Sequence, residues 1–226
     1  MFENKKKLTK KEIRQDKLVE LYFKTMSFIA HYQKQLLIAI GVIAVLVFSY
    51  IYFSSESKEK NAEAANLISK VYSLYEQGLY KEAIYGLGEV KGLLEIVHKY
   101  DNYEQGEKAK ILLANCYNNL GNLDSAYIFY KNYSGSIDLY KSVSLAGQAS
   151  VLEAKKEYKE AAKLYLKASK ITKENPFNSD YLLYSAANYL RIGDKEKAKE
   201  LLKEIKNNFP TSTASKEADI YLAIAY

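Results

Sequence analysis

The most pronounced feature of the hydropathy pattern is an uninterrupted apolar run near the start of the chain. The stretch from Leu36 to Phe53 contains eighteen residues and no charged side chain. A helix of that length rises about 27 Å, close to the roughly 30 Å thickness of a bilayer's hydrocarbon core. Tyr32, Tyr50 and Tyr52 stand near its ends, where aromatic side chains suit the membrane interface. The alternative, a buried core helix, rarely lacks a polar face over so many residues. The pattern therefore predicts a transmembrane helix over residues 36–53.

Before this run, apolar residues recur at steps of three and four. The members of this set are Ile13, Leu18, Leu21, Tyr22, Met26, Ile29 and Tyr32. Such spacing predicts an amphipathic helix with basic residues on its other face. This helix can lie on an anionic inner leaflet or pack on a partner. For the first ten residues, a solvated basic tail is an equal alternative.

After the apolar run, the helical period resumes near Asn61 and almost no strand pattern follows. Pro176 and Pro210 are expected where helices end. The chain is thus predicted to contain a basic amphipathic cytoplasmic segment over residues 1–35, a membrane helix over residues 36–53, a polar link over residues 54–60 and an all-α domain over residues 61–226.

The distribution of charge sets the predicted orientation. Residues 1–35 hold nine basic and four acidic side chains, whereas the remainder holds twenty-four basic and twenty-three acidic ones. Basic charge on one side of a span predicts that this side is cytoplasmic, so the large domain lies on the other side. A nearly neutral domain argues against nucleic-acid binding. A cleaved signal peptide competes with an uncleaved anchor, but its charged region would be unusually long and no cleavage site closely follows the run.

The sequence contains no recognisable catalytic constellation. Cys116 is the single cysteine, so no intramolecular disulfide can form, and a buried apolar role is expected for it. His31 and His98 do not stand at metal-ligand spacing. No phosphate-binding loop or nucleophile elbow occurs. We therefore expect neither catalysis nor a cofactor, a metal or a small-molecule substrate.

One phrase returns four times after residue 61. It begins at Gly78, Gly121, Lys156 and Gly193, and an alanine follows five residues later, at Ala83, Ala126, Ala161 and Ala198. A glycine there ends a helix in the left-handed conformation, and the alanine lets the next helix approach closely. Each copy therefore predicts a tight helical hairpin, although a generic helical bundle is the alternative fold.

This phrase and its flanking apolar residues resemble the tetratricopeptide repeat (TPR). In the fourth copy the matching positions are Leu182, Ala186, Tyr189, Ala198, Leu202, Ile205 and Pro210. In the first and weakest copy they are Leu67, Val71, Leu74, Ala83 and Leu87. The resemblance implies a right-handed superhelix of about four hairpins. Residues 211–226 would form a capping helix, with Ala218, Leu222 and Tyr226 facing inward.

The copies are not evenly spaced. Their alanines stand 43, 35 and 37 residues apart, which places additional residues around Tyr100–Gly106 and Ser134–Ile137. Gly86, Gly88 and Gly92 are expected within the second helix of the first copy, where they indicate close packing or an irregular helix.

The TPR resemblance also implies a concave groove lined by the first helix of each hairpin. Residue-by-residue transfer predicts a peptide- or partner-binding groove in which Tyr anchors an extended or helical peptide and Asn binds its backbone. The predicted groove residues are Ile68, Tyr72, Tyr75, Lys108, Ile111, Asn115, Asn118, Ser150 and Leu183. For each tyrosine, a packing role in the core is an equal alternative.

The order of these parts resembles the YfgM family, the ancillary subunits of the bacterial Sec translocon. The resemblance implies a single-pass protein of the bacterial inner membrane with a periplasmic TPR domain. Its implied partners are translocon subunits, nascent chains and periplasmic chaperones. Two alternatives are an assembly scaffold for cell-wall or outer-membrane factors and a membrane-tethered regulator that acts through its basic N-terminal segment.

Overall fold

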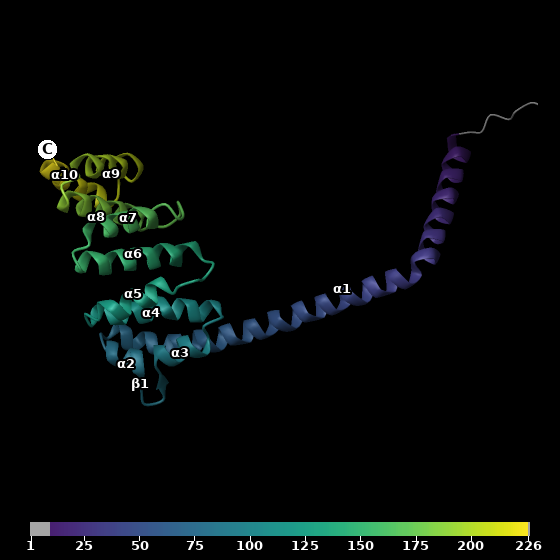
Figure 1. The fold of residues 1–226 in the computed structure, drawn as a ribbon, viewed down its shortest axis with the longest axis horizontal. Helices are drawn as coiled ribbons and strands as arrows, with labels where there is room; N and C mark the ends of the chain where they lie inside the picture. Colours follow the sequence, from purple (N-terminus) through teal and green to yellow (C-terminus); the bar gives the residue numbers. More distant parts are fainter. Residues whose placement is uncertain (1–9, 226) are drawn as a thin grey trace, which may run out of the picture. The chain divides into compact units, whose positions relative to one another are not determined.

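The computed structural model describes the backbone of residues 10–225 and the side chains of residues 17–225. The chain divides into two compact units, Met1–Glu56 and Ser57–Tyr226. In this described range the elements are ten helices and two very short strands (Figure 1). The all-α prediction is confirmed.

The first unit consists of the N-terminal part of helix α1 (Lys10–Glu76). The backbone leaves the helical region at Tyr32, where φ is −102° and ψ is 15°. By length and composition, α1 is the one helix in the described part of the chain that can cross a membrane, a test that a signal sequence also passes. Its apolar run has no buried residues.

The expected link over residues 54–60 needs a correction, because these residues are helical and α1 does not restart at Asn61. The segment Ser-Ser-Glu-Ser-Lys-Glu-Lys contains neither glycine nor proline, and Glu and Lys are good helix formers. A polar segment without glycine or proline therefore need not interrupt a helix.

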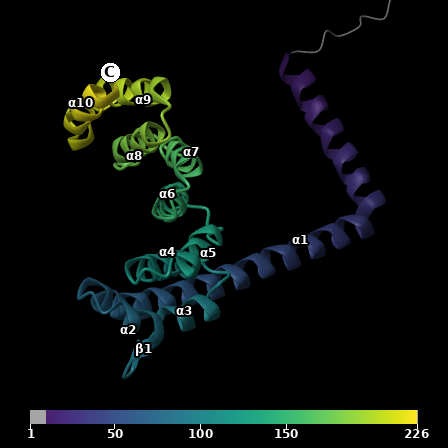
Figure 2. The ribbon, with the colours of Figure 1, turned by 60° about the vertical axis from the view of Figure 1, so that its left-hand side comes forward.

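The second unit is a stack of antiparallel helices (Figures 1 and 2). After the end of α1, the first helices of the hairpins are α4 (Glu104–Asn119), α6 (Asp138–Ala154) and α8 (Asn178–Arg191). The second helices are α2 (Tyr80–Tyr85), α5 (Leu123–Lys131), α7 (Tyr158–Ala168) and α9 (Lys195–Asn208). Helix α10 (Thr213–Ala225) packs on α8 and α9. The predicted four hairpins and capping helix are confirmed in residues 57–225.

All four hairpin turns use the same pair of backbone hydrogen bonds. At the first turn, the N–H of Gly78 donates to the carbonyl of Tyr75, and the N–H of Leu79 donates to the carbonyl of Leu74. The equivalent two bonds recur at Gly121, Lys156 and Gly193. This is the Schellman arrangement, which needs a left-handed residue at the turn. Lys156 adopts it with φ of 66°, at the position where the other copies have glycine.

We predict that Lys156→Gly stabilises the domain. A side chain in the left-handed region costs about 1 kcal/mol, which glycine avoids. Urea titration followed by circular dichroism should therefore show a free energy of unfolding about 1 kcal/mol higher than that of the natural protein. Gly193→Ala is the matched control. Its free energy of unfolding should fall by a similar amount, because only the φ of 79° at Gly193 opposes a side chain there. A loss of stability in Lys156→Gly would contradict the argument.

The first hairpin departs from the prediction. Helix α2 ends at Tyr85, and two short antiparallel strands follow, β1 (Gly86–Leu87) and β2 (Val90–Lys91). Helix α3 (Leu93–Lys99) then completes the repeat. A Cβ atom on Gly92 would collide with the backbone of residues 84–86, so Gly92 permits this close approach. The three glycines therefore do not lie within the second helix as expected, although the close packing expected of them is present at Gly92. Leu87 is not packed in the core as the repeat pattern implied, because it is 53% exposed.

The core runs along the whole stack. One apolar cluster joins the end of α1 to α2–α5 with Val151 of α6, a second joins residues of α6, α7 and α8, and a third joins residues of α7–α10. The alanines of all four repeated phrases are fully buried. Ala218 is buried and Leu222 packs against the third cluster, as expected for the capping helix. Tyr226 lies outside the described residues.

Candidate functional site

A cavity of about 280 Å³ opens among the first helices of three successive repeats. Helix α1 contributes Ile68 and Tyr72, α4 contributes most of the wall, and α6 contributes Tyr140. The complete lining is Ile68, Tyr72, Gln105, Lys108, Ile111, Leu112, Asn115 and Tyr140. Five predicted groove residues, from two different repeats, are thus brought together in one place.

The cavity has little net charge because its one cation is compensated. The ammonium of Lys108 lies 2.8 Å from a carboxylate oxygen of Glu104, one turn earlier on α4. The same ammonium lies 5.6 Å from the ring centroid of Tyr140, within the range of a cation–π contact. The ammonium of Lys108 is therefore held by Glu104 and Tyr140 at the edge of the cavity. For this reason the cavity does not select strongly for anionic ligands.

Asn115 is held in place by two tyrosines. The hydroxyl of Tyr130 donates to its side-chain oxygen at 2.5 Å. Burial raises the pKa of Tyr130, so the hydroxyl stays protonated and remains a donor. Burial also raises the pKa of Tyr75, although a hydrogen bond from Asn115 opposes that rise. The amide of Asn115 is therefore oriented before any ligand arrives.

An aromatic row extends from the cavity along the end of α1. Tyr72 and Tyr75 stack with ring centroids 5.8 Å apart, and Tyr80 meets Tyr75 edge to face at 5.6 Å. Tyr72 is 45% exposed, while Tyr75 is half-buried. Tyr72 therefore offers an open aromatic face to a ligand, and Tyr75 supports it.

The remaining predicted residues lie elsewhere. Asn118 is half-buried on α4 one turn beyond Asn115, and Ser150 is half-buried on α6 beside Tyr165. Leu183 is only 3% exposed and belongs to the cluster to which α10 contributes Ala214 and Ala218. Its assignment to the groove is corrected, because the chain's own capping helix packs against α8.

Three residues of the lining were not predicted: Gln105, Leu112 and Tyr140. Tyr140 stands in the first turn of α6, three residues before Val143, the first groove position that the TPR pattern gives on this helix. An aromatic residue one helical turn before a predicted groove position was therefore the sequence signal that could have identified Tyr140 as a lining residue.

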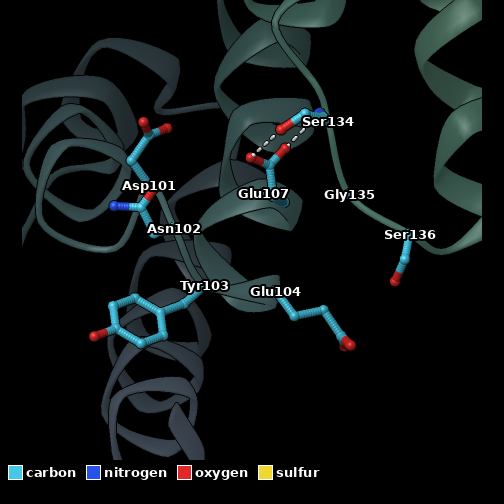
Figure 3. Close-up of a pocket in the computed structure, with 8 residues that line it drawn as sticks. All are labelled: Asp101, Asn102, Tyr103, Glu104, Glu107, Ser134, Gly135 and Ser136. Carbon is cyan, nitrogen blue, oxygen red and sulfur yellow. Dashed lines mark hydrogen bonds between the residues drawn. The ribbon is translucent and has the colours of Figure 1, made fainter. Parts of the chain in front are cut away.

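A second cavity, of about 320 Å³, lies between the α3–α4 turn and the α5–α6 loop (Figure 3). The carboxylate of Glu107 accepts hydrogen bonds from the backbone N–H and the hydroxyl of Ser134, at 2.7 and 2.9 Å (Figure 3). Lys110 pairs with Glu107 at 2.6 Å and with Asp101 at 2.5 Å. Burial alone lowers the pKa of Lys110, but the hydrogen bonds to Asp101 and Glu107 outweigh it and raise the pKa above its ordinary value. Asp101 and Glu107 are thus committed to an ion-pair cluster that joins the α3–α4 turn to the α5–α6 loop.

Neither cavity shows reactive chemistry. Within the described residues, no group of His, Cys, Asp or Glu side chains is arranged to hold a metal ion. Cys116 is fully buried, and burial raises its pKa to about 12. A thiol with that pKa is almost entirely protonated at neutral pH and is a poor nucleophile.

We predict that Cys116 of the folded protein does not react with a thiol reagent such as dithionitrobenzoate at pH 8. In urea, where the chain unfolds, one thiol per chain should react within minutes. Comparable rates with and without urea would show that this part of the stack opens readily.

The comparisons with known proteins agree with this architecture. Residues 180–212 match the sequence pattern of the family described as tetratricopeptide repeat. Two solved structures are similar in fold, a crystal structure of a Podosopora anserina putative kinesin light chain with nearly identical TPR-like repeats and that of a variant of the same protein. Each has a TM-score of 0.58 and 16% identity, over 74% of this chain and 86% of the other. Among curated proteins, none matches this chain.

The fold and the comparisons define the class of protein. Residues 57–225 form a TPR-type helical-repeat domain, and TPR domains are generally protein-interaction scaffolds. TPR repeats and TPR-like folds point to a non-catalytic scaffold class.

Proposed function

We propose that this protein is a membrane-anchored scaffold that binds a peptide segment of its partners in the α1–α4–α6 cavity. The observation that carries the proposal is the convergence of exposed Tyr72, oriented Asn115 and apolar Ile68 and Ile111 in one neutral cavity. An aromatic anchor beside a fixed amide suits a peptide, because the ring packs on a side chain and the amide binds the backbone.

The apolar run of α1 supports membrane anchoring in this proposal. Residues 36–53 are long and apolar enough to cross a bilayer, and basic residues are concentrated on their N-terminal side. We propose a single-pass inner-membrane protein with its N-terminus in the cytoplasm and its TPR domain in the periplasm. The order of its segments resembles that of the YfgM family, and this favours a location beside the Sec translocon. There the protein would pass emerging chains to periplasmic chaperones.

A photo-crosslinking amino acid at Tyr72 tests the partner. Benzoylphenylalanine is a conservative replacement for this exposed ring, and the same group at Tyr85 serves as the control. Tyr85 is 69% exposed on α2 and does not line the cavity. The full chain is irradiated in native membranes, and the adducts are identified by mass spectrometry.

Adducts specific to Tyr72 that contain translocon subunits, nascent chains or periplasmic chaperones would support the proposal in full. Adducts with cell-wall or outer-membrane factors would assign the protein to envelope assembly instead. The same adducts at Tyr72 and Tyr85, or none at Tyr72, would show that the cavity is not the binding surface.

A further inference from the structure

The described helix before the apolar run separates its side chains into two faces. At 3.6 residues per turn, the apolar side chains of residues 17–32 occupy more than half of the helix circumference. All of them are exposed: Leu18, Val19, Leu21, Tyr22, Phe23, Met26, Phe28, Ile29 and Tyr32. Thr25 also lies on this face, and its hydroxyl donates to the carbonyl of Leu21 at 2.7 Å. The other hydroxyls on the face are those of Tyr22 and Tyr32, which suit the polar boundary of a membrane.

The opposite face is polar and mainly basic. It carries Lys17, Glu20, Lys24, Ser27 and His31, and Lys34 follows on the same side. Glu20 lies 3.7 Å from Lys24, so its charge is partly neutralised. Within the side chains that the structure describes, residues 17–225, no carboxylate pairs with Lys17 or Lys34, so both can meet negative charge from outside the helix.

The helical geometry of α1 is interrupted where this amphipathic segment ends. Tyr32 has dihedral angles close to the bridge region of the Ramachandran map, and no proline or glycine is nearby. Four residues later the uniformly apolar run begins at Leu36. Two helices of different character therefore meet at one non-helical residue.

We infer that residues 17–32 form an interfacial helix, which lies along the headgroup layer of the same bilayer that residues 36–53 cross. This inference rests on the membrane anchoring proposed above. A lipid surface fits better than a partner helix, because a helix seam buries a narrow stripe whereas this face spans more than half of the circumference. Basic residues on the outer face suit anionic headgroups, and the aromatic residues suit the boundary with the acyl chains. Tyr32 provides the corner between the interfacial and the spanning helix.

The experiment uses single nitroxide labels on the full chain in vesicles of phosphatidylethanolamine and phosphatidylglycerol. Ile29→Cys reports the centre of the apolar face, and Ser27→Cys reports the polar face two residues away. Val42→Cys reports the apolar run itself. Buried Cys116 does not compete for the label. Paramagnetic resonance then compares relaxation by oxygen, which concentrates in lipid, with relaxation by a water-soluble nickel chelate.

We expect the label at Ile29 to favour oxygen at least several-fold over the nickel chelate, and the label at Ser27 to show the reverse. Nickel access at both positions would place the helix in water and overturn the inference. Shielding from both reagents at Ile29 would indicate a protein contact and would also overturn it. The label at Val42 separates the two proposals, because nickel access there would refute the membrane anchor itself.

Discussion

Replacing Glu107 with alanine is expected to lower the free energy of unfolding by about 3 kcal/mol. Glu107 and Lys110 are only 7% and 6% exposed, so the change leaves a buried ammonium with a single carboxylate, that of Asp101. It also removes both acceptors of Ser134, including the one for a backbone N–H. Breaking one side of a buried pair is costly because the remaining charge is already removed from water.

Urea titration of the full chain in detergent, followed by circular dichroism, measures this loss. Asp101→Ala is the matched control: Asp101 contacts the same ammonium but is 57% exposed, so its loss should cost less than about 1 kcal/mol. The double variant Glu107→Leu, Lys110→Met should recover more than half of the stability, because it removes both buried charges together. If Glu107→Ala costs no more than Asp101→Ala, the pair is solvated and does not join the loops.

The second large effect is expected from Gly106→Ala, with a loss of about 3 kcal/mol or more. A Cβ atom at Gly106, in the first turn of α4, would overlap the backbone carbonyl of Tyr100. Tyr100 is fully buried, so its backbone cannot move aside without disturbing the core. Alanine normally strengthens a helix relative to glycine, which makes the expected sign opposite to that of intrinsic propensity.

Gly121→Ala is the appropriate control for this substitution. Nothing lies within 4 Å of a Cβ atom at Gly121, so only its φ of 76° opposes alanine, at about 1 kcal/mol. Thermal melts of both variants beside the natural protein should therefore rank Gly106→Ala well below Gly121→Ala. A neutral or stabilising Gly106→Ala would mean that the α3–α4 turn relaxes to admit a methyl group.

The hairpins could be predicted from the sequence because their chemistry is local. A left-handed residue and a small residue five positions later are enough to specify the turn and the close helix contact, even at Lys156. The hairpin of β1 and β2 was missed for the opposite reason. The repeat alignment imposed a helix on Gly86 and Gly92, whereas the pairing of Leu87 with Val90 is set by backbone contacts that the alignment does not contain.

The cavity could be predicted in part, for a similar reason. Ile68, Tyr72, Lys108, Ile111 and Asn115 followed from repeat positions, since the first helices stack in register. Leu183 occupies the same kind of position, but its exposure depends on where α10 packs. Tyr140 depends on the additional loop residues before α6. Both outcomes arise from irregular parts of the array, which periodicity does not describe.

The arrangement of the core also determines how the domain unfolds. Among helices α2–α10, extensive packing occurs between helices that are neighbours or next neighbours in the stack, and no large interface joins α2 or α3 to α9 or α10. Cooperativity in such a linear array is transmitted only from repeat to repeat. The α9–α10 end can therefore melt while α4–α6 stay folded. Hydrogen exchange should then be graded along the chain, with the slowest amides in the central repeats and the fastest in α10.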